Sequence, residues 1–157
     1  FSNSPVAVAA ANLRGRVLVQ RTSAGTQGVV AATGAERLFA ASLVCASATA
    51  AALTATGLGT PTYVITGRFP DAPDLGDDDE LVADYIERAR LGQPLDAAEV
   101  ARAVAATDEA ARTLAVGEGH VDPADIAYAV DVDRFDFAME VHRVDGGLRM
   151  RPCRPDR

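Results

Sequence analysis

Short apolar runs alternate with helix-like segments along the first part of the chain. Three of these runs are nearly continuous, which is typical of strands buried on both faces of a sheet. They cover residues 16–20, 37–41 and 63–67. Polar stretches that contain glycine follow the first and the last run, as expected where a strand turns into a helix. The alternation predicts an α/β fold with a mixed, largely buried sheet flanked by helices.

The helical segments are predicted from capping residues and from apolar residues spaced three and four apart. Ser4 before Pro5 is typical of a helix start, and Ser47 is a candidate N-cap for an alanine-rich helix. Acidic residues crowd the start of the segment that begins at Asp78, where the helix dipole favours negative charge. The predicted helices cover residues 6–13, 29–32, 48–56, 78–91, 96–116 and 124–130.

The end of the chain has the pattern of a closing hairpin. Residues 137–144 and 148–151 are joined by Asp145-Gly146-Gly147, a turn sequence that suits a tight reversal. The length of 157 residues is that of one domain, and neither a repeat nor a linker divides it. We therefore expect a single α/β domain over residues 1–157, with a C-terminal helical stretch and a hairpin. Because the chain opens directly on a helix cap without Met, we expect it to be incomplete at its N-terminus.

Composition narrows the classes of partner. Hydrophobic residues make up 48% of the chain, enough for a folded core. There are 22 acidic and 15 basic residues, all the basic ones arginine, and the net charge of −7 disfavours nucleic acid and membrane surfaces. No apolar run is long enough for a transmembrane helix. The two cysteines lie far apart, which argues against a zinc site and fits a cytoplasmic protein.

The loop over residues 21–28 is the first candidate site. It lies between a predicted strand and a predicted helix, and its two glycines allow a close approach of the backbone to a ligand. Helix N-terminal amides bind anions, and an arginine adds a fixed charge. A simple capping loop between strand and helix has the same pattern, and no phosphate-binding P-loop sequence is present. The residues with suitable groups are Arg21, Thr22, Ser23, Gly25 and Thr26.

The acidic run that ends at Glu80 is the second candidate site. Four carboxylates in succession repel one another and attract a hard divalent cation, which prefers oxygen ligands. The alternative is a solvated first turn of a helix. Arg68 lies just upstream, at the carboxyl end of a predicted strand, where α/β folds place ligands. A further acidic motif, Asp131-Val132-Asp133, does not fit an aspartyl-phosphate enzyme, because it follows a helix-like stretch and Arg134-Phe135 come next. It does not fit a calcium loop either, because Phe137 stands near the position where that loop requires glycine.

Several segments together resemble the 2-phosphosulfolactate phosphatase family of coenzyme M biosynthesis, over nearly the whole chain. The segments are Ser2-Asn3-Ser4-Pro5, residues 20–28 (Gln-Arg-Thr-Ser-Ala-Gly-Thr-Gln-Gly), Thr66-Gly67-Arg68, residues 78–85, and residues 122–141. The resemblance implies a Mg²⁺-dependent acid phosphatase that hydrolyses the phosphate monoester of a small anionic hydroxy acid. It implies that Asn3, Ser4 and the loop line the active site.

The same resemblance places the acidic pair of the family on Asp78 and Asp79, as metal ligands and catalytic residues. Arg21 or Arg68 would then hold the phosphate oxygens, and a metal-oriented water would attack. The chain departs from the family in having Asp-Asp where the family has Glu-Asp, and in lacking the family's upstream motifs. Two alternatives therefore stay open: action on a different phosphorylated acid, or a non-catalytic anion-binding relative. The sequence also leaves a homo-oligomer open.

Overall fold

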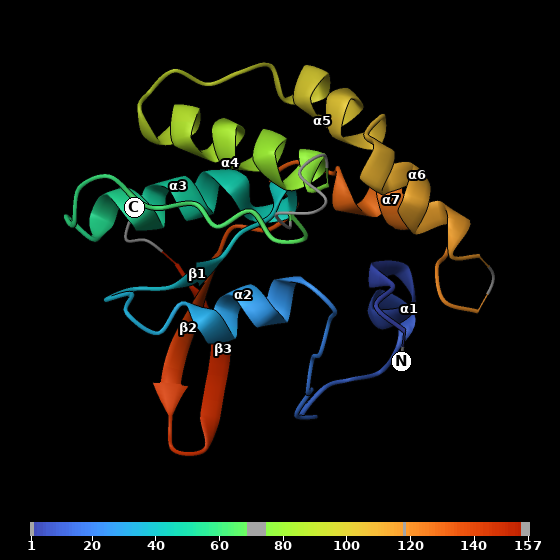
Figure 1. Cartoon of the computed structure of the whole chain (residues 1–157), viewed down its shortest axis with the longest axis horizontal. Helices are drawn as coiled ribbons and strands as arrows, with labels where there is room; N and C mark the ends of the chain where they lie inside the picture. Colours follow the sequence, from blue (N-terminus) through green and yellow to red (C-terminus); the bar gives the residue numbers. More distant parts are fainter. Residues whose placement is uncertain (1, 69–74, 118, 155–157) are drawn as a thin grey trace.

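The computed structural model describes residues 2–68, 75–117 and 119–154. Seven α-helices, one 3-10 turn and three strands are found in these ranges (Figure 1). In chain order they are α1 (Pro5–Ala10), α2 (Gly25–Ala31), β1 (Phe39–Ala40), η1 (Leu43–Cys45), α3 (Ala46–Ala55), α4 (Asp77–Arg90), α5 (Ala97–Ala105), α6 (Asp108–Ala115), α7 (Asp125–Ala129), β2 (Ala138–Val144) and β3 (Gly147–Cys153). The mixed α/β class is confirmed.

The described strands form one antiparallel sheet in the order β1-β2-β3. Ala40 pairs with Met139, and β2 and β3 form the predicted C-terminal hairpin. Only the start of β2, including Ala138 and Val141, is buried, and β3 is almost entirely exposed. The expectation of a sheet buried on both faces therefore holds for one end of β2 only.

Helices α3, α4 and α5 build the core above the sheet (Figure 1). Ile86 and Ala46 are fully buried where α4 meets α3, and Val100 closes the cluster from α5. Small alanine side chains on α3 let α4 approach closely, and the apolar stripe of α4 fills the space between them. In the acidic first turn of α4, Asp77, Asp78 and Asp79 are half-buried and Glu80 is exposed.

Arg143 joins the hairpin to the end of α2. Its guanidinium donates hydrogen bonds to the backbone oxygens of Ala32 and Ala35, at 2.7 and 3.2 Å. A cation suits this position because the last carbonyls of a helix lack partners within the helix.

Two predicted strands are wrong. Residues 16–20 and 63–67 do not pair with any strand in the described parts of the chain. Val17 and Val19 are 92% and 94% exposed. Their β-type composition marks a preference for an extended backbone, but a strand also requires a neighbour with which to exchange hydrogen bonds. The predicted strand over residues 37–41 is shortened to two residues.

The predicted helix over residues 96–116 is two helices. Thr107 ends the first and caps the second, because its hydroxyl donates to the Val104 carbonyl and accepts from the amide of Ala110. The Asp77 carboxylate of α4 accepts a further hydrogen bond from the amide of Asp108, at 3.1 Å. Side-chain acceptors thus satisfy amides that an unbroken helix would have used internally.

Two other helix starts differ from the prediction. Ser47 does not cap α3, which begins one residue earlier at Ala46. Helix α2 begins at Gly25, four residues before its predicted start, so two glycines lie inside it. No helix among the described residues is long and apolar enough to cross a membrane.

Candidate functional site

Thr22 and Thr26 tie the first candidate loop into a closed turn. The Thr26 amide donates to the Thr22 hydroxyl at 3.0 Å, and the Thr22 amide donates to the Thr26 hydroxyl at 3.1 Å. The Thr26 hydroxyl in turn donates to the Thr22 carbonyl at 2.9 Å. Both threonine hydroxyls are therefore engaged in shaping the loop, and their predicted contact with substrate stays a prediction.

The closed turn leaves three successive amides without partners. The backbone N–H groups of Ser23, Ala24 and Gly25 have no hydrogen-bond acceptor among the described residues. Arg21 beside them is exposed, and in the described ranges its guanidinium has no ion pair. Successive free N–H groups with a nearby arginine form a surface that can accept an anion.

Thr66 lies against this loop from the other side. An atom at the Cβ position of Gly28 would be only 2.7 Å from the Thr66 methyl, so no side chain fits at Gly28 without displacing Thr66. The corresponding position of Gly25 is 4.0 Å from the Thr66 hydroxyl. Helix α2 and its glycines therefore pack directly on Thr66.

The same threonine holds Asp79 of the acidic turn. Its amide and its hydroxyl both donate to Oδ2 of Asp79, at 3.1 and 2.8 Å. Gly76, the N-cap of α4, allows this contact, because its φ is +77° and a side chain there would lie 3.0 Å from the Thr66 carbonyl. The structure thus brings together the loop, the Thr66-Gly67-Arg68 segment and Asp79, and their role as one binding site stays a prediction.

Asp78 is half-buried and lies toward α6. Burial raises the pKa of this carboxyl, and the neighbouring charges of Asp79 and Glu109 raise it further. A shared dication would relieve this repulsion, so the two aspartates have the chemistry of a metal-binding pair. Asp79 is bonded to Thr66 beside the loop, and Asp78 is close enough to Glu109 of α6 to feel its charge.

Arg68 is held by the acidic turn. Its guanidinium pairs with Glu80 at 2.7 Å and donates to the Leu75 carbonyl at 3.2 Å. The ion pair is exposed, so water competes for both partners and an anion can displace Glu80. The predicted contact of Arg68 with substrate stays a prediction.

The N-terminal segment is attached at a different point. Ser4 is buried; its hydroxyl donates to Asp125 at 2.8 Å and accepts from the amide of Ala7. Asn3 accepts a hydrogen bond of 3.4 Å from Gln20, just before the loop. These contacts give Ser4 a structural role and connect Asn3 to the loop, while substrate contact by either residue stays a prediction.

The carboxylates of the acidic turn suit a magnesium site that is completed by water and substrate, rather than a site in which the protein supplies every ligand. No group of three side chains that could ligate a metal is found among the described residues. Mg²⁺ retains several waters and is commonly bound by one or two carboxylates together with substrate phosphate oxygens. Asp79, with Asp78 beside it and an anion-accepting loop opposite, matches that pattern.

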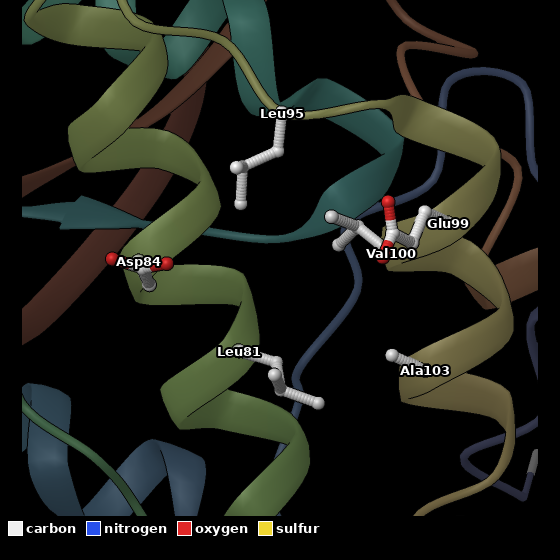
Figure 2. A pocket seen from close by; sticks show the side chains of 6 residues that line it. All are labelled: Leu81, Asp84, Leu95, Glu99, Val100 and Ala103. Atoms are coloured by element: carbon white, nitrogen blue, oxygen red, sulfur yellow. The ribbon is translucent and has the colours of Figure 1, made fainter.

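A separate cavity of about 200 Å³ lies between α4 and α5. Figure 2 shows the side chains of Leu81 and Leu95 pointing into it, and its lining includes none of the predicted site residues. The candidate site lies elsewhere, at the N-terminal end of α4.

Two residues of the site were not assigned by sequence reasoning. The sequence indicates Thr66 only as part of a motif, and Gly28 only as a glycine that allows a close approach of the backbone to a ligand. The available signal was the unusual glycine within a helix, which indicates a close approach by another part of the chain. The sequence does not identify Thr66 as the residue that approaches Gly28, because the two meet only through the tertiary fold.

A mixed α/β fold with an anion-accepting loop beside an acidic helix turn has the groups that a phosphatase requires. A protein-family model, described as 2-phosphosulpholactate phosphatase, matches residues 1–143 of 157. The chain therefore belongs to the 2-phosphosulpholactate phosphatase family. Searches of curated proteins and of solved structures gave no match.

Proposed function

We propose that this protein hydrolyses the phosphate monoester of a small anionic hydroxy acid, 2-phosphosulfolactate or a close analogue, with Mg²⁺. Membership of a phosphatase family supports the reaction class. The observation that carries the proposal is the position of Thr66, which contacts the anion-accepting loop and the Asp79 carboxylate at once. Phosphate held by the loop would therefore lie next to a metal held by the acidic turn.

In this proposal Asp79 and Asp78 hold the ion. When bound, Mg²⁺ neutralises phosphate charge and lowers the pKa of a bound water. The bond between phosphorus and the ester oxygen breaks, a bond from the water oxygen to phosphorus forms, and inorganic phosphate and the free hydroxy acid leave. The chain's own residues position and neutralise, because phosphoryl transfer requires little covalent work from a protein.

The loop supplies the donors for the phosphate. The amides of Ser23, Ala24 and Gly25 would bind oxygens as charge develops on them, and Arg21 would add a planar, two-pronged cation. Arg68 and Asn3 would bind the second anionic group of the substrate, which distinguishes a phosphorylated acid from a simple phosphate ester. The free amides also favour the second candidate, a non-catalytic anion-binding protein.

The test measures phosphate release from 2-phosphosulfolactate with and without Mg²⁺, for the wild type and for Asp79→Asn. Asparagine keeps an oxygen for Thr66 but removes the charge that binds the metal. We expect Asp79→Asn to lose at least about tenfold in Mg²⁺ affinity, a loss that even an outer-shell partner can cause, and most of its activity. The matched control is Asp84→Asn on the same helix, where the aspartate pairs with Arg88 at the surface.

The outcomes separate the alternatives. Release from 2-phospholactate or phosphoglycolate but not from the sulfonate would indicate a different phosphorylated acid. Phosphate binding without turnover would favour the anion-binding relative. Full Mg²⁺ dependence in Asp79→Asn, equal to that of Asp84→Asn, would overturn the assignment of the metal site.

A further inference from the structure

We propose that the outer edge of β3 is a docking site for an extended acidic segment of another protein, which adds a strand to the sheet. This site lies on the C-terminal hairpin and is independent of the proposed phosphatase activity. Strand β3 ends the order β1-β2-β3, and no strand among the described residues pairs with its outer side. Six of its seven residues are exposed, and the hairpin projects from the body of the molecule (Figure 1).

The register of the hairpin shows which way the backbone groups of β3 point. The Val141 amide donates to the Leu38 carbonyl at 2.8 Å, on the β1 side of β2. Backbone groups along a strand point alternately to its two sides, so the positions before and after Val141 face β3. Their partners across the hairpin are Arg151 and Arg149, whose backbone groups therefore face β2. The alternate positions of β3 face the free edge.

Leu148 and Met150 present the free backbone groups. Pro152, the next position in this alternation, has no N–H, so the proline removes a donor from the free edge and none from the hairpin. An antiparallel strand added here would form its hydrogen-bonded pairs with Leu148 and Met150. The positions opposite Arg149 and Arg151 would then be the other kind of pair, in which facing side chains lie closest.

The two arginines supply the charge that meets the partner. Arg149 and Arg151 lie two positions apart on one face of the hairpin, directly opposite His142 and Glu140. Glu140 is already paired with the Arg37 guanidinium and lies 3.6 Å from His142. Neither Arg149 nor Arg151 forms an ion pair within the described ranges of the chain. Both cations are therefore free to pair with carboxylates from outside.

Charged and apolar side chains alternate along β3, and this alternation defines the partner. Leu148 and Met150, on the face opposite the arginines, are 39% and 47% exposed. Opposite charges that face each other across strands stabilise pairing, and like charges destabilise it. The complementary segment therefore has acidic residues two positions apart with an apolar residue between them. An antiparallel second copy of β3 would place arginine opposite arginine, which disfavours self-pairing at this edge.

The experiment titrates a synthetic peptide with blocked ends, Thr-Glu-Val-Glu-Val-Thr, into the whole chain and follows the backbone amides by NMR. We expect the amide signals on the free edge of β3 to shift. The double variant Arg149→Gln with Arg151→Gln should bind the peptide about 2- to 30-fold more weakly, the range for two opposite-charge pairs across strands. The matched control is Arg14→Gln with Arg16→Gln, which removes equal charge from two exposed arginines two residues apart. It should bind the peptide as the wild type does.

Modified peptides test whether the segment binds as a strand. Methyl groups on both valine nitrogens remove the donors that would face β3, so this peptide should lose binding. Methyl groups on both glutamate nitrogens would point away from β3, so this second peptide should retain it. The rearranged peptide Thr-Glu-Glu-Val-Val-Thr has the same composition without the alternation and should bind more weakly.

The outcomes that overturn the proposal are distinct. Absence of binding to the wild type, or equal binding by the two double variants, rules out docking at the arginines. Equal binding of the rearranged peptide, or of the two methylated peptides, shows general charge attraction and rules out an added strand. Tighter binding of a single-stranded oligonucleotide, weakened by the same two substitutions, would identify nucleic acid as the partner instead. Thermal unfolding shows whether each variant is folded, and the peptide series on the wild type decides the question without any variant.

Discussion

Asp125 anchors the N-terminal segment through a carboxylate that is almost completely buried. It accepts hydrogen bonds from the Ser4 hydroxyl and from the amides of Val6 and Asp122, at 2.8, 3.0 and 2.8 Å. Burial alone would raise the pKa of this carboxyl, but the three donors outweigh it and lower the pKa below its ordinary value. The charged form is therefore the one that stabilises the contact between α1 and α7.

We expect Asp125→Asn to lower the free energy of unfolding at pH 7 by about 1–3 kcal/mol, the cost of leaving buried polar groups unsatisfied. Because the folded-state pKa is lowered, the contribution of Asp125 is complete above the unfolded value of about 4 and is lost as pH falls through the folded value. Urea unfolding at pH 7 and pH 3 should show the two proteins converging in acid. Asp145→Asn, in the exposed hairpin turn, is the control. An equal gap at both pH values would contradict the assignment.

Element boundaries follow the sequence where local chemistry decides them. The acidic first turn and basic last turn of α4 predict both of its ends to within one residue, and the Asp-Gly-Gly turn predicts the hairpin. The start of α3 was predicted wrongly because its capping group comes from a distant part of the chain. Asp133 accepts from the amide and hydroxyl of Ser47, at 2.7 and 2.5 Å, and no local pattern indicates this contact.

Asp133 caps α3 through its side chain and has an unfavourable backbone conformation. Substitutions can separate the contributions of these two features to stability. Its φ of +57° lies in the left-handed region, which costs a residue with a side chain about 1–2 kcal/mol. We expect Asp133→Ala to lose a cap interaction of about 1 kcal/mol while still paying that cost. Asp133→Gly should lose the cap but relieve the backbone, and Asp133→Asn should stay nearest to the wild type. Denaturant midpoints give the order, and a glycine variant less stable than the alanine variant would contradict it.

At the scale of the whole molecule, the sequence predicted the class of fold but not the pairing of strands. The loop and the acidic turn are recognisable from residue type, whereas their meeting at Thr66 depends on how α2 packs. Residues 16–20 have the composition of a strand, yet Val17, Leu18 and Val19 are exposed and unpaired in the described structure. An extended apolar segment with free backbone groups is a template for pairing with another chain.

We therefore expect the chain to self-associate through residues 17–19. The double substitution Val17→Thr and Val19→Thr keeps the β preference but replaces apolar surface, so it should reduce association measured by analytical ultracentrifugation. The control is Val30→Thr with Val116→Thr, at two valines that are 61% and 60% exposed but far apart in the chain. Association that falls equally in both double variants would show that general hydrophobicity, rather than this segment, is responsible.

The link made by Arg143 has a consequence for how the molecule opens. Its guanidinium donates to two backbone oxygens just beyond α2, so the same side chain connects the far end of the hairpin to the end of that helix. Separating them in a fluctuation breaks both bonds at once. Amide protons of α2 and of the outer half of β2 should then exchange with solvent through a common opening, as one cooperative unit. The exposed hairpin, although remote in sequence from the loop at residues 21–28, would thus set how long that loop keeps its shape.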